Sequence, residues 1–166
     1  MSKVTPMEAY SGGEFGLTFP VFPHEAKGHE PINGVTEKGL EVFVIFTDTP
    51  GTLMALQMAE GLAQKLEAHI RLLVPYEVPY TLPLTKPAVP VEFLEGQVRD
   101  LAGKTRLEVA AHICLCRDKG RTLECLLRPH SLIVVGGKKR WWPTSAQKLA
   151  RALQKHGHHV IFAELR

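Results

Sequence analysis

The run Lys-Lys-Arg-Trp-Trp at residues 138–142 combines three cations with two large aromatic side chains. Lysine and arginine attract phosphate groups and tryptophan can stack on a nucleobase, so the run has the composition of a site for single-stranded nucleic acid. The alternative is that Trp141 and Trp142 pack as plugs against the domain, while the cations are ordinary surface residues. Five residues carry little specificity, and we favour the alternative.

Asp48 is a second candidate, because it directly follows the apolar run 42–46 (Val-Phe-Val-Ile-Phe), which is typical of a buried strand. A carboxylate at the carboxyl end of a strand can contact the base or the ribose of a nucleotide. It can also cap the helix that begins around Pro50, since aspartate is a preferred N-cap and proline is tolerated in the first turn. The two roles are compatible.

The three cysteines are predicted to be inert thiols. Cys114 and Cys116 are separated by one residue rather than two, and with Cys125 they leave a metal site without an evident fourth ligand. Their odd number also argues against a disulfide framework and favours a reducing, cytoplasmic compartment.

The histidines match no metal motif. Two His-Glu pairs, at 24–25 and 29–30, lie five residues apart among prolines, whereas a zinc protease needs histidines four apart on a helix. Three more surround Gly157 at a predicted helix end and are interpreted as cap and surface residues: His156, His158 and His159.

No catalytic residue is predicted. The sequence has no Gly-x-Ser-x-Gly elbow, no Walker loop and no full dinucleotide fingerprint, and its carboxylates show no catalytic pairing. A non-enzymatic protein is therefore expected, and an enzyme that hydrolyses or transfers from ATP is the less favoured alternative.

The net charge of +3 is unevenly distributed. Residues 125–163 contain seven basic residues and no acidic one, whereas residues 1–124 contain 12 basic and 16 acidic residues. This asymmetry predicts an anionic partner or ligand near the C-terminal third, or else a solvated helix face.

The composition is that of one globular domain, because 166 residues with 45% hydrophobic content can bury a core. No apolar stretch approaches the roughly 20 residues of a membrane-spanning helix, so no span is predicted. The N-terminus lacks the apolar run of a signal peptide, so export is not expected.

Apolar runs and helical periods alternate from residue 41 onward. This order predicts an open parallel α/β sheet with helices on both faces, a three-layer sandwich. The alternating pattern of the third strand places it at a sheet edge. The predicted strands are 42–46, 70–74, 107–115, 131–135 and 159–163.

Residues 1–40 are predicted to be an extension outside the domain of residues 41–166. Phe15–Phe22 is expected to form one extended segment against the domain or a partner subunit, with mobile flanks. The five prolines in 75–90 predict a long irregular loop with exposed Tyr76 and Tyr80.

Residues 40–166 resemble the universal stress protein family, a branch of the adenine-nucleotide-binding α/β domains. Residues 44–48 (Val-Ile-Phe-Thr-Asp) are similar to its first strand, and 74–90 coincides with its variable insertion. Residues 131–136 (Ser-Leu-Ile-Val-Val-Gly) are similar to its fourth strand, Asp-Leu-Ile-Val-Val-Gly. The resemblance implies a five-stranded sheet in the order 3-2-1-4-5, with Asp48 and Gly136 side by side at the carboxyl edge, where such sheets bind ligands.

The chain departs from the phosphate-binding motif of the family, Gly-x2-Gly-x9-Gly-Ser/Thr. Gly136 takes the first position, but Lys139 stands at the second, and the loop reaches Thr144 and Ser145 several residues early. Either the cations supply by charge what the glycines supply by backbone donors, or the tryptophans fill the site and no phosphate binds.

The leading hypothesis is a cytoplasmic universal-stress-type module that binds ATP, AMP or another phosphate ligand. The resemblance implies that Asp48 and the backbone near Val74 receive the base, and that the following residues receive phosphate: Gly136, Gly137, Lys138, Thr144 and Ser145. Relatives commonly form homodimers through the last strand, here 159–163. The alternative is the same fold with a closed pocket, acting as a protein-interaction or oligomerisation module; single-stranded nucleic acid is less favoured.

Overall fold

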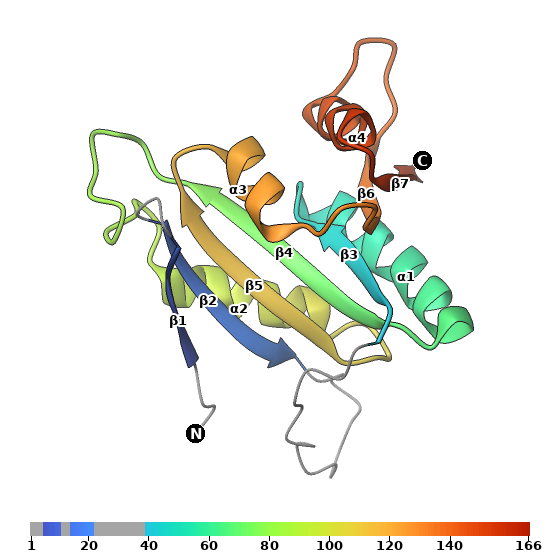
Figure 1. Ribbon diagram of the computed structural model, residues 1–166, viewed down its shortest axis with the longest axis horizontal. Helices are drawn as coiled ribbons and strands as arrows, with labels where there is room; N and C mark the ends of the chain where they lie inside the picture. The colour runs from blue at the N-terminus through green and yellow to red at the C-terminus, as the bar shows by residue number, and fades with distance from the viewer. Residues whose placement is uncertain (1–4, 11–13, 22–38) are drawn as a thin grey trace, which may run out of the picture.

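The computed structural model describes residues 5–10, 14–21 and 39–166 (Figure 1). Its sheet has seven strands in the order β1-β2-β5-β4-β3-β6-β7. Five of them run parallel and confirm the predicted order 3-2-1-4-5: β3 (Glu41–Ile45), β4 (His69–Glu77), β5 (Val109–Cys116), β6 (Leu132–Lys138) and β7 (His159–Leu165).

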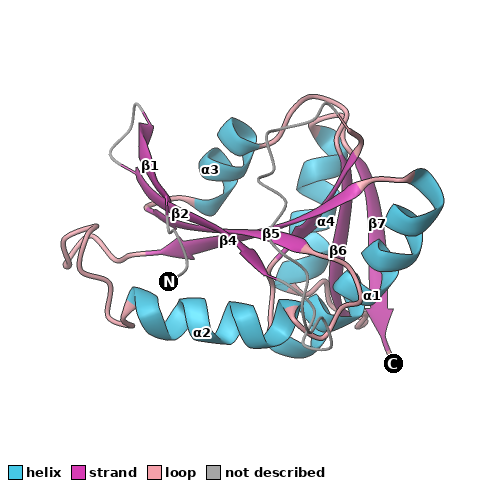
Figure 2. Cartoon of the chain, turned by 90° about the horizontal axis from the view of Figure 1, so that it is seen from below, coloured by secondary structure: helices cyan, strands magenta, loops and turns pink. Residues whose placement is uncertain are grey.

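Four helices cover the two faces of this sheet, as predicted (Figure 2). The α1 (Thr49–Leu66) and α2 (Val91–Ala102) helices lie on one face, and α3 (Lys119–Leu126) and α4 (Ser145–Lys155) lie on the other. Side chains of β3 alternate between the two layers, since Val42 and Val44 pack toward α1 and Phe43 and Ile45 toward α3 and α4. The strands are continuously apolar because both of their faces are buried.

The prediction that the third parallel strand lies at a sheet edge is wrong. Two further strands, β1 (Thr5–Tyr10) and β2 (Glu14–Val21), extend the sheet, and β2 pairs antiparallel with β5 from Phe15 opposite Leu115 to Val21 opposite Val109. The expected extended segment thus lies against the domain over residues 15–21. Of the flanks expected to be mobile, residues 5–10 form the β1 strand, and residues 1–4, 11–13 and 22–38 lie outside the described residues.

The second parallel strand is longer than predicted, because β4 continues through Pro75 to Glu77 alongside β5. The Leu73 carbonyl accepts a hydrogen bond from Phe46 N, so the backbone N–H and C=O groups of residue 73 point toward β3. Those of residue 75 point the same way, because backbone groups alternate in direction along a strand. The β3–β4 pairing ends at Leu73, so the missing N–H of Pro75 leaves no ladder bond unmade. Tyr76 is consequently half-buried and not exposed, whereas Tyr80 is exposed as expected.

Candidate functional site

The carboxyl edge of the sheet brings Asp48 and Gly136 together, as the sequence predicts. β3 and β6 are parallel neighbours with Ile45 opposite Val135, so the turn into α1 lies beside the end of β6. Asp48 is the N-cap of α1, and its Oδ1 accepts a hydrogen bond of 2.7 Å from Gly51 N. The capping role proposed for Asp48 is therefore observed, with the side chain at the surface.

The first turn of α1 approaches the end of β6 closely enough for the two backbones to touch. A Cβ atom placed on Gly136 would lie 1.8 Å from the carbonyl oxygen of Gly51, and one placed on Gly51 would lie 2.6 Å from the carbonyl oxygen of Gly136. Real Cβ atoms do not come this close to a backbone oxygen, so both positions require glycine. At this point the space between α1 and β6 is filled by the chain itself.

Two threonines that were not predicted as site residues complete this contact. Thr47 Oγ1 donates to the Gly136 carbonyl at 2.7 Å, and Thr47 N donates to Thr52 Oγ1 at 3.1 Å. Thr52 is fully buried. The available signal was the run Thr-Asp-x-x-Gly-Thr at 47–52, in which short polar side chains surround a predicted helix start.

Gly137 and Val74 are both buried and lie in packed surroundings. A Cβ on Gly137 would be 2.8 Å from Cβ of Ala146, so α4 rests directly on this end of β6. Val74 is 5% exposed and belongs to the core cluster beneath α1 and α2. The two residues therefore build the core around the carboxyl edge.

Lys138, Thr144 and Ser145 lie where β6 ends and α4 begins. Thr144 caps α4 in a capping box with Gln147, in which Gln147 N donates to Thr144 Oγ1 at 3.3 Å and Thr144 N donates to Gln147 Oε1 at 2.9 Å. Thr144 Oγ1 also lies 3.3 Å from the Lys138 carbonyl oxygen. The side chains of Lys138 and Ser145 are exposed.

The two tryptophans do not plug the site. Trp141 is 95% exposed and Trp142 is 80% exposed, and Lys139 and Arg140 beside them are exposed as well. The prediction of packed tryptophans is therefore wrong. Both tryptophans lie between the end of β6 at Lys138 and the N-cap of α4 at Thr144, outside the two packed elements.

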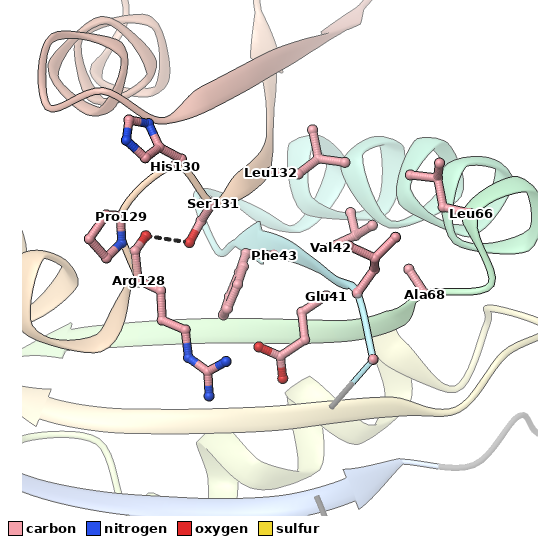
Figure 3. Close-up of a pocket in the computed structure, with 12 residues that line it drawn as sticks. Glu41, Val42, Phe43, Leu66, Ala68, Arg128, Pro129, His130, Ser131 and Leu132 are labelled. Atoms are coloured by element: carbon pink, nitrogen blue, oxygen red, sulfur yellow. Dashed lines mark hydrogen bonds between the residues drawn. The ribbon is translucent and has the colours of Figure 1, made fainter. Parts of the chain in front are cut away.

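The pocket shown in Figure 3 lies at the opposite, amino-terminal edge of the sheet. Its volume is about 240 Å³, and it is lined by the residues that lead into β3 and β6, with Leu66 and Ala68 from the end of α1. The charged groups of Arg128 and Glu41 point toward the same space (Figure 3). Glu41 is already paired with Arg71 at 2.6 Å. No motif in the sequence indicated this cavity.

Neither a metal centre nor a membrane span is found in the described ranges. Within residues 5–10, 14–21 and 39–166, no three histidine, cysteine, aspartate or glutamate side chains gather as metal ligands would. No helix there has the length and apolar character needed to cross a membrane.

Comparison with known proteins gives no match: neither a family model, nor a curated protein, nor a solved structure matches the chain.

Replacing Asp48 with alanine is expected to lower the free energy of unfolding by about 1 kcal/mol, because the Gly51 N–H loses its acceptor. Urea denaturation measures the change. Asparagine at position 48 keeps an acceptor and serves as the matched control, with an expected loss of only a few tenths of a kcal/mol. Equal stability of the alanine variant and the parent protein would contradict the capping role.

Proposed function

We propose that the chain is a cytoplasmic, non-enzymatic α/β module that acts through contacts made on its surface and holds no nucleotide between β3 and β6. The observation that carries this proposal is the backbone contact between Gly51 and Gly136, where one added methyl group would fall 1.8 Å from a carbonyl oxygen. A ligand that used the backbone of Gly136 would need the space that α1 occupies.

Two polar groups at this edge are already bonded within the chain, which ties them to the closed contact between Gly51 and Gly136. The Asp48 carboxylate accepts from Gly51 N, and the Gly136 carbonyl accepts from Thr47 Oγ1. The exposed groups of this region lie farther out, on the loop between β6 and α4. Recognition by the outer surface therefore suits the chain better than recognition in the crevice.

Self-association through β7 is part of the proposal. β7 is the last strand in the sheet order, so its outer edge is not paired within the described sheet. Val160, Ile161 and Phe162 are half-buried in one copy and would be covered further by a second. An open strand edge of this kind favours pairing with another chain.

Binding of ATP, AMP or another phosphate ligand is the second candidate, in line with the resemblance to universal stress proteins. It is favoured by the exposed Lys138 and Ser145 next to the N-terminus of α4, where helix N–H groups and a cation would attract an anion. A phosphate bound there would lie outside the Gly51–Gly136 contact. A hydrolytic role would additionally require phosphate release above a protein-free blank.

Thermal denaturation with millimolar ATP, AMP and sulfate separates the two candidates. A closed crevice predicts an unchanged melting temperature with all three, whereas a ligand at a hundred times its Kd would add about 2.7 kcal/mol to the free energy of unfolding. Native mass spectrometry of the purified protein is expected to show a dimer without a bound nucleotide. A co-purified nucleotide, or a rise in melting temperature with ATP, would overturn the surface-acting proposal.

A further inference from the structure

We propose that the loop between β6 and α4, with the outer side of α4, docks onto an anionic lipid surface. We call this surface the basic tryptophan surface. It consists of residues 138–142 and the exposed cations of α4, which are Lys148, Arg151 and Lys155. The inference rests on the proposed function, because it names the class of partner that a surface-acting module would contact.

The loop presents its aromatic side chains to solvent. Trp141 and Trp142 are the most exposed large apolar side chains of the described residues apart from Tyr80, at 95% and 80%. The loop projects beyond the start of α4, away from the rest of the molecule (Figure 1). Large apolar groups on such a projection lose their water contacts only when a partner covers them.

Tyr80 differs from these tryptophans, because it already has a partner of its own. It is 84% exposed, and the guanidinium of Arg117 lies 5.0 Å from its ring centre. No comparable ring contact is found for Trp141 or Trp142 within the described part of the chain. The tryptophan pair is therefore the candidate contact.

Cations continue from the loop along α4. Lys148, Arg151 and Lys155 are exposed and follow at intervals of three and four residues, which places them on one side of the helix. The segment 125–163 has no acidic residue. The nearest acidic residues the structure shows are Glu164 on β7, opposite Gly137 at the base of the loop, and Glu124 of α3, which lies 3.3 Å from His156 at the end of α4. The basic tryptophan surface thus combines one sign of charge with an apolar tip.

This combination favours a membrane surface over a nucleic acid. Tryptophan is preferred at the level of lipid headgroups, and each lysine or arginine near an anionic leaflet adds attraction. Binding sites for single strands pair stacking rings with a cationic groove that follows the backbone. Here the rings lie on a projecting tip, while the pocket of Figure 3 is at the other edge of the sheet. A tip can reach a flat surface.

Intrinsic fluorescence tests the proposal directly, because the chain contains two tryptophans and both are in the loop. Vesicles of phosphatidylcholine with phosphatidylserine are added to the full chain, with pure phosphatidylcholine vesicles and an oligothymidine in parallel. The expected result is a blue shift of tryptophan emission with the anionic vesicles alone, and co-sedimentation that weakens as salt rises.

Variants assign the effect to the basic tryptophan surface. The triple variant Lys138→Gln, Lys139→Gln and Arg140→Gln is expected to weaken vesicle binding on the order of a hundredfold, since each cation near the surface contributes about fivefold. The matched control places glutamine at three exposed lysines elsewhere, which is expected to change binding less than threefold in total: Lys65, Lys86 and Lys104. Vesicle binding by Trp141→Ala is compared with vesicle binding by Phe93→Ala. The second variant removes an exposed ring on α2 and is the matched control.

Three outcomes would overturn the inference: no spectral shift with anionic vesicles, equal weakening by the control variant, or a shift with oligothymidine alone. The last would assign the loop to nucleic acid. None of these outcomes alters the melting temperature with ATP or AMP, so the failure of this inference and the failure of the proposed function remain distinguishable.

Discussion

Alanine in place of Gly136 is expected to destabilise the protein by about 3 kcal/mol or more, a large effect for a single added methyl group. The added Cβ would lie 1.8 Å from the Gly51 oxygen, 2.6 Å from the Gly51 carbonyl carbon and 3.1 Å from Cβ of Ala55. Two of these atoms are backbone, so no side-chain rotation relieves the overlap. Either α1 moves away from β6, or the protein does not fold.

Urea denaturation of soluble protein provides the measurement, and two helical glycines provide matched controls. A Cβ on Gly61 in α1 or on Gly96 in α2 would meet no atom within 4 Å. Alanine at either control position is expected to stabilise the protein by about 0.5–1 kcal/mol, because alanine is the better helix former. A Gly136→Ala variant as stable as the parent would show that α1 and β6 are not in contact.

The same variant also tests why position 136 is glycine. A glycine kept for phosphate binding would tolerate alanine in the unliganded fold and lose only the ligand. A glycine kept for the approach of α1 loses stability without any ligand present. Gly51→Ala is expected to follow Gly136→Ala with a smaller loss, because its Cβ would lie 2.6 Å from the Gly136 oxygen.

The parallel part of the sheet could be predicted because burial on both faces leaves a strong trace in the sequence. Residues 42–46 and 132–135 are continuous apolar runs, and the helices α1 and α4 begin at recognisable caps, Asp48 and Thr144. The β2 strand left a weaker trace, an extended segment at 15–22 that could lie against the domain or against a partner subunit. In its partner β5, larger apolar residues alternate with Ala110, His112 and Cys114. We interpreted these three residues as a less buried face of the strand, and we therefore placed the strand at a sheet edge.

The candidate site was harder to predict, because the same residue types serve several roles. Gly136 has the position of a phosphate-binding glycine, yet its visible role is to admit the backbone of Gly51. Trp141 and Trp142 are apolar enough for a core, and their exposure depends on where the capping box of Thr144 starts α4. A sequence gives the identity of such residues, whereas their role depends on distances between segments that are far apart in the chain.

Stability is expected to fall as the pH drops below about 6.5, and His112 on β5 contributes to this fall. His112 is buried, 3% exposed, and burial lowers its pKa below the ordinary value of 6.5, with the positive charge of Arg71 on the neighbouring β4 lowering it further. The unfolded chain therefore takes up a proton at a pH where the folded chain still holds a neutral ring. Protons bound by the unfolded state reduce stability as the pH falls.

The slope of the free energy of unfolding against pH is the quantity to measure. Each such group adds up to about 1.4 kcal/mol per pH unit between its unfolded and its folded pKa, and its contribution fades within about one pH unit above 6.5. His112→Gln removes the titrating ring and is expected to flatten the slope, whatever its effect on stability at neutral pH. Urea denaturation at a series of pH values from neutral downward gives the slope.

His158 supplies the control for this measurement. Partial burial and the nearby His156, His130 and His159 also lower its pKa, so it acts in the same direction. Its Nδ1 accepts from Ser131 N at 3.3 Å, which requires an unprotonated nitrogen. Because His158 is less buried than His112, His158→Gln is expected to flatten the slope less. If His158→Gln abolished the slope and His112→Gln left it unchanged, the site of proton uptake would be the helix end at His158, and burial in β5 would not be its cause.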